Sequence, residues 1–169
     1  LIHWPVKDVF VEAWKIMKEY YKKRVFKAIG VSNFHKNHLD ELLKEAEVIP
    51  AVNQIELHPY LTQEDLVAYN KEKGIATECW GPVARGKVFS DEVLGLIADK
   101  YGKTISQIVL KWEVQRGLIT IPKSIHKDRI VENQNIFDFE LSLDDMNTIS
   151  KLNKNERMIE GADPDNFNF

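Results

Sequence analysis

The stretch IATECWGP, residues 75–82, decides the fold class, because a short apolar run ends there in polar and aromatic groups and then turns. Four other stretches have the same form: LIHWP at 1–5, AIGVSN at 28–33, AVNQIELH at 51–58 and LITIPKS at 118–124. Helical patterns separate these stretches, and the clearest spans residues 10–21, where apolar side chains recur every three or four positions. Strands and helices that alternate through short connections predict parallel strands and an α/β fold.

Apolar strands covered on both faces fit a barrel or a doubly wound sheet equally well. A doubly wound dinucleotide domain would show Gly-x-Gly-x-x-Gly after its first strand, and the sequence has no such motif. A (β/α)8 barrel has eight strands and about 250 residues. We expect residues 1–169 to form a single domain that supplies about the last five βα units of such a barrel, with residues 155–169 as an ordered loop over its mouth. The alternative for residues 155–169 is disorder.

The composition excludes several classes of partner. The net charge is -3, and basic residues alternate with acidic ones, which argues against nucleic acid binding. No apolar stretch approaches the roughly 20 residues that cross a bilayer, so we expect no membrane partner and a cytoplasmic location. Cys79 is the only cysteine, which excludes an intramolecular disulfide framework and a Cys-x-x-Cys zinc motif.

Helix boundaries follow from capping residues. The sequence predicts helix starts at Thr62 with Asp65, at Ser90, at Thr104 with Gln107 and at Ser142, and helix ends at Gly74, Gly102 and Gly117. An apolar stripe of Leu39, Leu42, Leu43 and Ala46 predicts a further helix before Pro50, and a short helix is expected around residues 128–133.

Residues after the last predicted strand suit a phosphate. Lys123 and Ser124 close that strand, and Arg129 lies in a short helix whose N-terminal N–H groups also favour anions. In a barrel, phosphate often binds at the loops after the last two strands and a short extra helix. Glu132 and Asn133 are placed one turn further on, where a carboxylate and an amide could bind the exocyclic amine of an adenine. The alternative is a solvated Lys and Arg on a barrel rim.

The second, third and fourth strand ends carry groups that suit a flat amide-bearing ring. Ser32, Asn33 and the inward-facing Gln54 together could recognise a carboxamide. Trp80 could stack on a flat ring. The alternatives are that Asn33 caps the following helix and that Trp80 is a core residue.

His3 ends the first run and could act as a general acid or as a hydrogen-bond donor to a substrate oxygen. The alternative is a buried structural histidine. His3, Glu56 and His58 together would also form a set of ligands for a catalytic metal, as in a hydrolase. That interpretation leaves no role for the residues suited to a phosphate or a carboxamide, which are Lys123, Arg129, Ser32, Asn33 and Gln54.

With these residues assembled, the chain resembles the C-terminal part of an aldo-keto reductase of the bacterial type. The resemblance rests on LIHWP, AIGVSNF, VNQIELHPY, WGP, IPKSIHKDRIVEN and the DPDNF ending, which occur in the family's order and nearly span the chain. It implies NADPH-dependent reduction of small aldehydes or ketones at the top of a (β/α)8 barrel.

The resemblance also implies roles for individual residues. Those matching Ser32, Asn33 and Gln54 hold the nicotinamide carboxamide, and Trp80 matches the aromatic that stacks on the nicotinamide. The matches to Lys123, Ser124 and Arg129 bind the 2'-phosphate, and those to Glu132 and Asn133 contact the adenine. A loop from Gly81 to Lys87 would cover the pyrophosphate, with Arg85 and Lys87 as cations. His126 stands where some relatives have threonine.

Of the family's four catalytic residues, only the histidine that orients the substrate has a match, His3. The tyrosine acid and its lysine and aspartate partners lie on strands that this sequence lacks, and Tyr60 is not a substitute. We therefore expect turnover to require a preceding N-terminal segment. The alternative is a non-catalytic nucleotide-binding or assembly module that pairs with another chain or with itself.

Overall fold

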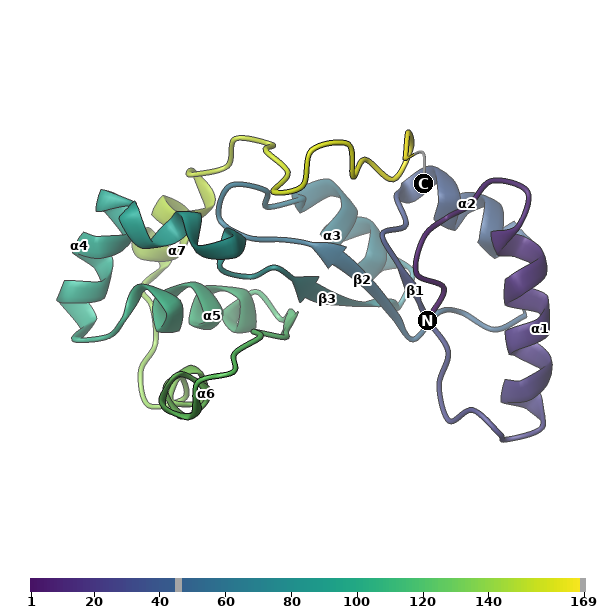
Figure 1. Ribbon diagram of the computed structural model, residues 1–169, viewed down its shortest axis with the longest axis horizontal. Helices are drawn as coiled ribbons and strands as arrows, with labels where there is room; N and C mark the ends of the chain where they lie inside the picture. Colours follow the sequence, from purple (N-terminus) through teal and green to yellow (C-terminus); the bar gives the residue numbers. More distant parts are fainter. Residues whose placement is uncertain (45–46, 168–169) are drawn as a thin grey trace. The chain divides into compact units, whose positions relative to one another are not determined.

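The computed structural model describes residues 1–44 and 47–167. These residues form two compact units, which are treated separately: unit 1 contains Leu1–Ile55, Gln63–Glu78 and Ile159–Phe169, and unit 2 contains Glu56–Thr62 and Cys79–Met158. The strands in the described residues are β1 (Val31–Ser32), β2 (Val52–Glu56), β3 (Ala76–Trp80) and β4 (Ile119–Thr120), and they are hydrogen-bonded in the order β1-β2-β3-β4. Figure 1 labels the first three of them. The α/β fold predicted from the sequence is confirmed.

In unit 1, β1 and β2 pair in parallel, and Ser32 lies opposite Gln54. The first apolar run appears as a single parallel bridge between Ile2 and Val31 instead of a strand. The N–H of Ile2 donates to Gly30 and the N–H of Ser32 donates to Ile2, so the run still pairs as a strand would. This register brings the ends of the first three predicted strands of the chain together.

The helices of unit 1 are α1 (Phe10–Lys22), α2 (Lys36–Lys44) and α3 (Glu64–Glu72). Phe10 and Trp14 of α1 are buried, and α1 packs on α2, where the rings of Phe10 and His38 meet at a steep angle with centroids 6.2 Å apart. Phe10 also makes a T-shaped contact with Phe34, which precedes α2, with centroids 5.2 Å apart. Leu39 and Leu42 of the predicted α2 stripe are buried as well, whereas Ala46 lies outside the described residues. Each large apolar side chain that is fully buried contributes roughly 1.5–3 kcal/mol.

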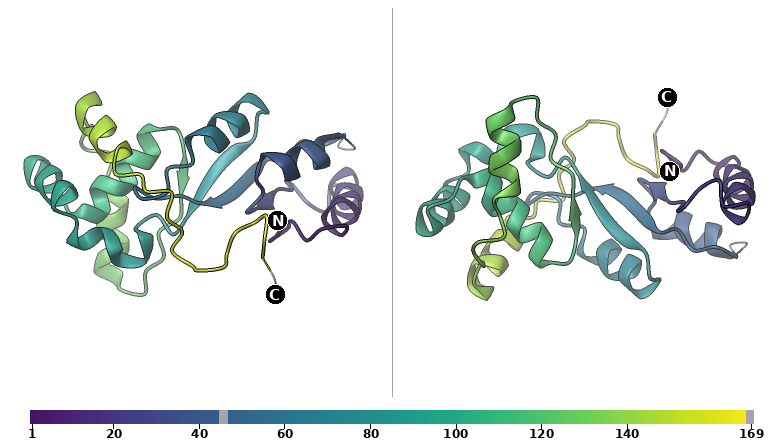
Figure 2. Two further views of the ribbon diagram at one scale, coloured as in Figure 1. Left: turned by 90° about the horizontal axis from the view of Figure 1, so that it is seen from above. Right: turned by 90° about the horizontal axis from the view of Figure 1, so that it is seen from below.

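Unit 2 contains a 3-10 segment, Ala84–Ser90, followed by α4 (Glu92–Tyr101), α5 (Ile105–Gln115), α6 (Lys127–Gln134) and α7 (Leu143–Ser150). Helix α5 is the centre of this unit: it packs on α4 and α6, and its residues Ile108, Leu110 and Trp112 are fully buried. The views in Figure 2 show α5 and α6 next to each other. This packing places α6 beside the N-terminal turn of α5, where the candidate site lies.

Most predicted helix boundaries are confirmed. Thr104 and Gln107 form a complete capping box, Ser142 accepts from the N–H of Asp145, and Gly102 and Gly117 have the left-handed backbone that ends their helices. The short helix after the last strand is present as α6.

Two predicted helix starts are wrong. Helix α3 begins at Glu64 after Gln63, so Thr62 is no cap; its N–H donates to Asn153 and its carbonyl accepts from Arg116. Helix α4 begins one residue later than expected, because Asp91 and not Ser90 accepts from the N–H of Leu94. In the described part of the chain, no helix has the length and apolar character needed to cross a membrane.

Candidate nucleotide-binding site

Ser32, Asn33 and Gln54 come together at the ends of β1 and β2, as the sequence predicts. The carbonyl oxygen of Gln54 accepts from Ser32 Oγ at 2.9 Å and from the N–H of Asn33 at 2.8 Å. Asn33 has a left-handed backbone with φ of 61°, a conformation that Asn tolerates better than most residues. Its Nδ2 donates to Ser32 Oγ and to the carbonyl of His3. These bonds join three predicted site residues and the backbone of a fourth.

His3 itself is exposed, so it is not a buried core histidine. Its ring lies 6.1 Å from that of Trp4, and both line an apolar pocket of about 380 Å³ in unit 1. The wall of this pocket includes Phe10 and Phe167. An imidazole at an apolar rim has the access to substrate that a catalytic or orienting histidine requires.

The side chain of Gln54 has a partner that the sequence did not suggest. Its Nε2 donates to Oε1 of Glu78 on β3 at 2.5 Å. Both side chains are half-buried, on the face opposite the buried Thr77 and Cys79 of β3. The period-2 alternation along residues 76–80 was the available signal.

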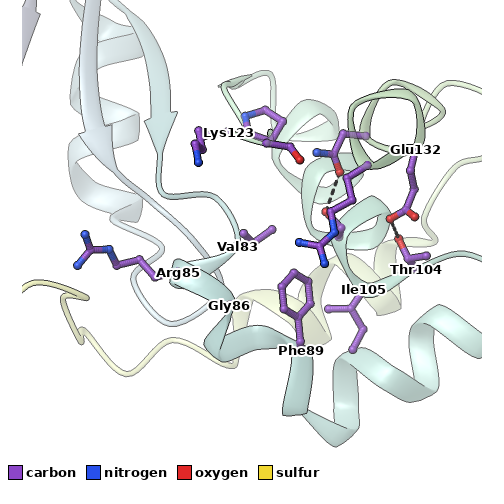
Figure 3. A pocket seen from close by; sticks show the side chains of 13 residues that line it. Val83, Arg85, Gly86, Phe89, Thr104, Ile105, Lys123 and Glu132 are labelled. Carbon is purple, nitrogen blue, oxygen red and sulfur yellow. Dashed lines mark hydrogen bonds between the residues drawn. The ribbon is translucent and has the colours of Figure 1, made fainter. Parts of the chain in front are cut away.

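A pocket of about 560 Å³ in unit 2 gathers the residues predicted for the nucleotide (Figure 3). Its walls are formed by Val83, Arg85, Gly86, Phe89, Thr104, Ile105, Ser106, Pro122, Lys123, Ser124, Arg129, Glu132 and Asn133. Lys123 and Arg129 are exposed and, among the described residues, neither is in an ion pair. Two available cations beside the first turns of α6 are suited to an anion.

The hydroxyl of Ser124 accepts from the N–H of His126, the residue that precedes α6. This bond folds the chain tightly between β4 and α6, and it keeps Ser124 and Arg129 on one pocket wall. His126 is not among the residues that line the pocket.

Glu132 and Asn133 are half-buried and already bonded to the start of α5. Oε1 of Glu132 accepts from Thr104 Oγ1 at 2.7 Å, drawn as a dashed line in Figure 3, and Oδ1 of Asn133 accepts from Ser106 Oγ at 2.9 Å. Gln107 of the capping box also donates to the backbone carbonyl of Glu132. The sequence predicted the pair but not these partners, since they depend on how α6 packs on α5.

The segment after Trp80 turns sharply. Gly81 has φ of 66°, and Ala84, Arg85 and Gly86 have φ of 47°, 52° and 96°, so three successive residues are left-handed. Arg85 belongs to the nucleotide pocket, where Figure 3 shows its side chain turned away from Glu132. Lys87 instead pairs with Glu156 at 3.2 Å and lines a separate pocket with Tyr60 and Asp91. The structure thus separates the two cations that the sequence grouped.

Tyr60 does not suit the role of the acid that protonates a substrate. Its hydroxyl donates to Asp91 at 2.8 Å, and burial together with that carboxylate raises the pKa of Tyr60 to about 12. A phenol with a raised pKa is a weaker acid at neutral pH. This agrees with leaving Tyr60 out of the catalytic set.

Glu56 and His58, which could belong to a metal site, are buried and engaged with each other. His58 Nε2 lies 3.2 Å from Glu56 Oε1, and the same oxygen accepts from the N–H of Met158 at 2.6 Å. Arg157 lies 3.6 Å from the other oxygen of Glu56. These contacts give Glu56 a structural role that its place in the sequence did not indicate.

The model of the aldo/keto reductase family matches residues 1–154 of this sequence. This chain belongs to the aldo/keto reductase family. The resemblance found in its motifs is thereby confirmed.

Two bacterial reductases match this chain over all or nearly all of its length. It is 50% identical to glyoxal reductase of Bacillus subtilis over 169 residues, which cover 100% of this chain and 60% of that protein. It is 47% identical to methylglyoxal reductase DkgA of Escherichia coli K12, covering 99% of this chain and 62% of the relative. The chain thus spans about three fifths of the length of these relatives.

The fold agrees with solved aldo-keto reductases. The crystal structure of a mutant of Gox0644 in complex with NADPH superposes with a TM-score of 0.94 at 42% identity, covering 99% of this chain and 62% of that one. This likeness confirms the prediction from the sequence that the chain supplies part of an α/β barrel.

Proposed function

We propose that this chain is the NADPH-binding part of an aldo-keto reductase that converts small aldehydes or ketones to alcohols. The observation that carries the proposal is the pocket of unit 2, in which Lys123, Ser124 and Arg129 share a wall with Glu132 and Asn133. Two cations and a hydroxyl suit the 2'-phosphate, and the carboxylate and amide suit the adenine amine. A 50% identical relative named glyoxal reductase supports a small carbonyl substrate.

Taken by itself, unit 1 carries residues that suit a nicotinamide. Ser32, Asn33 and Gln54 carry hydrogen-bonding side chains within one bonded cluster, which suits the carboxamide of a nicotinamide. We assign Trp80 and Gly81 to the nicotinamide, and Arg85 and Lys87 to the pyrophosphate, which Lys87 would reach only after leaving its ion pair with Glu156. Bound NADPH would supply the hydride that reduces the carbonyl carbon.

His3 is the residue of this chain that we assign to the substrate. Its exposed ring at the rim of an apolar pocket can donate a hydrogen bond to a carbonyl oxygen and orient it. The proton for that oxygen needs a stronger acid than Tyr60, whose pKa is about 12. We assign this step to a tyrosine, with its lysine and aspartate partners, outside these 169 residues.

We propose that residues 1–169 act as one domain, that residues 155–169 cover the mouth of the barrel, and that the protein works in the cytoplasm without nucleic acid or membrane partners. Residues 168–169 of that loop lie outside the described part of the chain.

The test combines binding and turnover. NADPH fluorescence titration of the 169-residue chain should show saturable binding, and a longer chain that includes the preceding barrel strands should oxidise NADPH in the presence of methylglyoxal. Failure of both chains to bind NADPH would overturn the proposal. Turnover by the 169-residue chain alone would overturn the part that places the acid elsewhere.

A further inference from the structure

Glu78 holds one end of the Gln54 side chain. The two residues lie on the adjacent strands β2 and β3, and Nε2 of Gln54 donates to Oε1 of Glu78 at 2.5 Å. The backbone of Gln54 is held as well, because its carbonyl oxygen accepts from Ser32 Oγ and from the N–H of Asn33. Both the main chain and the side chain of Gln54 are therefore fixed by neighbours.

The chemistry of the pair determines which way the amide faces. A glutamine amide has a donating nitrogen at one end and an accepting oxygen at the other, and the two ends are nearly equal in shape. An ionised carboxylate only accepts hydrogen bonds. The nitrogen must therefore face Glu78, since the reversed amide would place its oxygen against a carboxylate oxygen and lose the bond.

We propose that Glu78 is a positioning residue that presents Oε1 of Gln54 as a hydrogen-bond acceptor to the amide nitrogen of the nicotinamide. This inference rests on the proposed function and deepens it. A pyridine ring that carries a carboxamide donates two N–H bonds from that group, whereas one that carries an acetyl group donates none. Glu78 thus selects, through Gln54, for the amide form of the cofactor.

The decisive measurement compares two reduced cofactors, NADPH and its 3-acetylpyridine analogue, in which a methyl group replaces the amide nitrogen. Glu78→Gln preserves size but lets Gln54 turn either way. We expect the preference for NADPH over the analogue to fall roughly threefold to tenfold in Glu78→Gln, the range of one neutral hydrogen bond. An unchanged preference would overturn the inference.

Two further variants separate positioning from general destabilisation. In a Gln54→Ala background, Glu78→Gln should change the preference no further, because the residue through which it acts is absent. Glu72→Gln is the matched control, since Glu72 is an exposed residue of unit 1 paired only with its neighbour Lys73 in the described contacts. It should keep the full preference, and a loss there would count against a specific role for Glu78.

A measurement without cofactor keeps the two proposals distinguishable. The side-chain amide resonances of Gln54 in a ¹H–¹⁵N spectrum should shift in Glu78→Gln and stay in place in Glu72→Gln. Absence of NADPH binding by both chain lengths would refute the proposed function. Amide resonances that ignore Glu78→Gln would refute the pairing itself.

Discussion

Oε1 of Glu56 accepts a 2.6 Å hydrogen bond from the backbone N–H of Met158, 102 residues further along the chain. The carboxylate has 0% exposed side-chain area, and Arg157 approaches its other oxygen within 3.6 Å. A buried carboxylate at the end of β2 therefore holds the start of the C-terminal segment through both a main-chain bond and a charge.

Without this carboxylate, the segment around Arg157 should detach from the fold, so that a protease can reach the peptide bond after Arg157. In Glu56→Ala the Met158 N–H loses its acceptor and Arg157 loses the buried carboxylate 3.6 Å away, so we expect a loss of about 3–5 kcal/mol in the free energy of unfolding. Trypsin should then cut after Arg157 at least several times faster, as read by intact mass. Cleavage after the exposed Arg24 provides the internal control; equal acceleration at both sites would indicate global unfolding and not release of this segment.

Arg129→Ala should weaken NADPH binding selectively. Loss of one charged hydrogen bond to a phosphate costs roughly 1.5–3 kcal/mol, or about 10- to 100-fold in the dissociation constant. NADH lacks the 2'-phosphate, so its affinity should change little. Lys127→Ala removes the same charge from α6 at a residue outside the pocket and should affect neither cofactor. Equal weakening of NADPH and NADH by Arg129→Ala would contradict the assignment of this arginine to the 2'-phosphate.

Gly30→Ala and Gly95→Ala should have opposite effects on stability. A Cβ on Gly30 would lie 2.7 Å from the carbonyl oxygen of Val52, so β2 would have to shift, at a cost of about 1–3 kcal/mol. Gly95 lies within α4 with no atom in the way, and alanine there should stabilise the helix by up to about 1 kcal/mol. Urea unfolding measures both changes, and a neutral Gly30→Ala would show that β1 and β2 approach less closely than described.

Asp145 should make stability depend on pH in the acid range. One of its oxygens accepts from Lys100 at 2.7 Å and from Ser142 and Tyr101 at 2.6 Å, and these donors, led by Lys100, lower its pKa from 3.8 to about 2. A carboxyl with a lowered folded-state pKa stabilises above its unfolded pKa, and that contribution is lost as the pH falls from about 4 to about 2.

Asp145→Asn should therefore lower stability at neutral pH and flatten the slope of the unfolding free energy between pH 4 and pH 2. The neighbouring Asp144→Asn alters an exposed carboxyl and should keep the slope. Chemical unfolding at a series of pH values distinguishes the two variants. An unaltered slope in Asp145→Asn would show that the three donors do not act on this group.

Local chemistry decided which features the sequence could predict. The capping box of Thr104 and Gln107 involves residues three apart. One turn and one short helix bring together the predicted phosphate-binding residues Lys123, Ser124 and Arg129. Such features depend on little beyond their own segment. The structure brings these residues together, and it also brings together Ser32, Asn33 and Gln54, whose strand ends the parallel α/β pattern places at one edge of a sheet.

The features that the sequence did not reveal depend on distant packing. Thr62 looks like a helix cap, but Asn153 and Arg116 take up its backbone groups. Glu78 becomes part of the candidate site only through the pairing of β2 with β3, and Glu56 only through the return of the C-terminal segment. The alternation within β3 indicates which face Glu78 occupies but not that it meets Gln54, and a contact over 102 residues leaves no mark in local residue patterns.

The bonds from Thr104 to Glu132 and from Ser106 to Asn133 determine what an adenine amine would gain on binding there. Each of these acceptor oxygens has a second lone pair, so an adenine amine could share the oxygen with the hydroxyl that already binds it. The two hydroxyls hold the acceptors in place before a base arrives, so little side-chain freedom remains to be lost on binding. Adenosine without phosphates should still be a poor competitor, because it lacks the charge that Lys123 and Arg129 would bind.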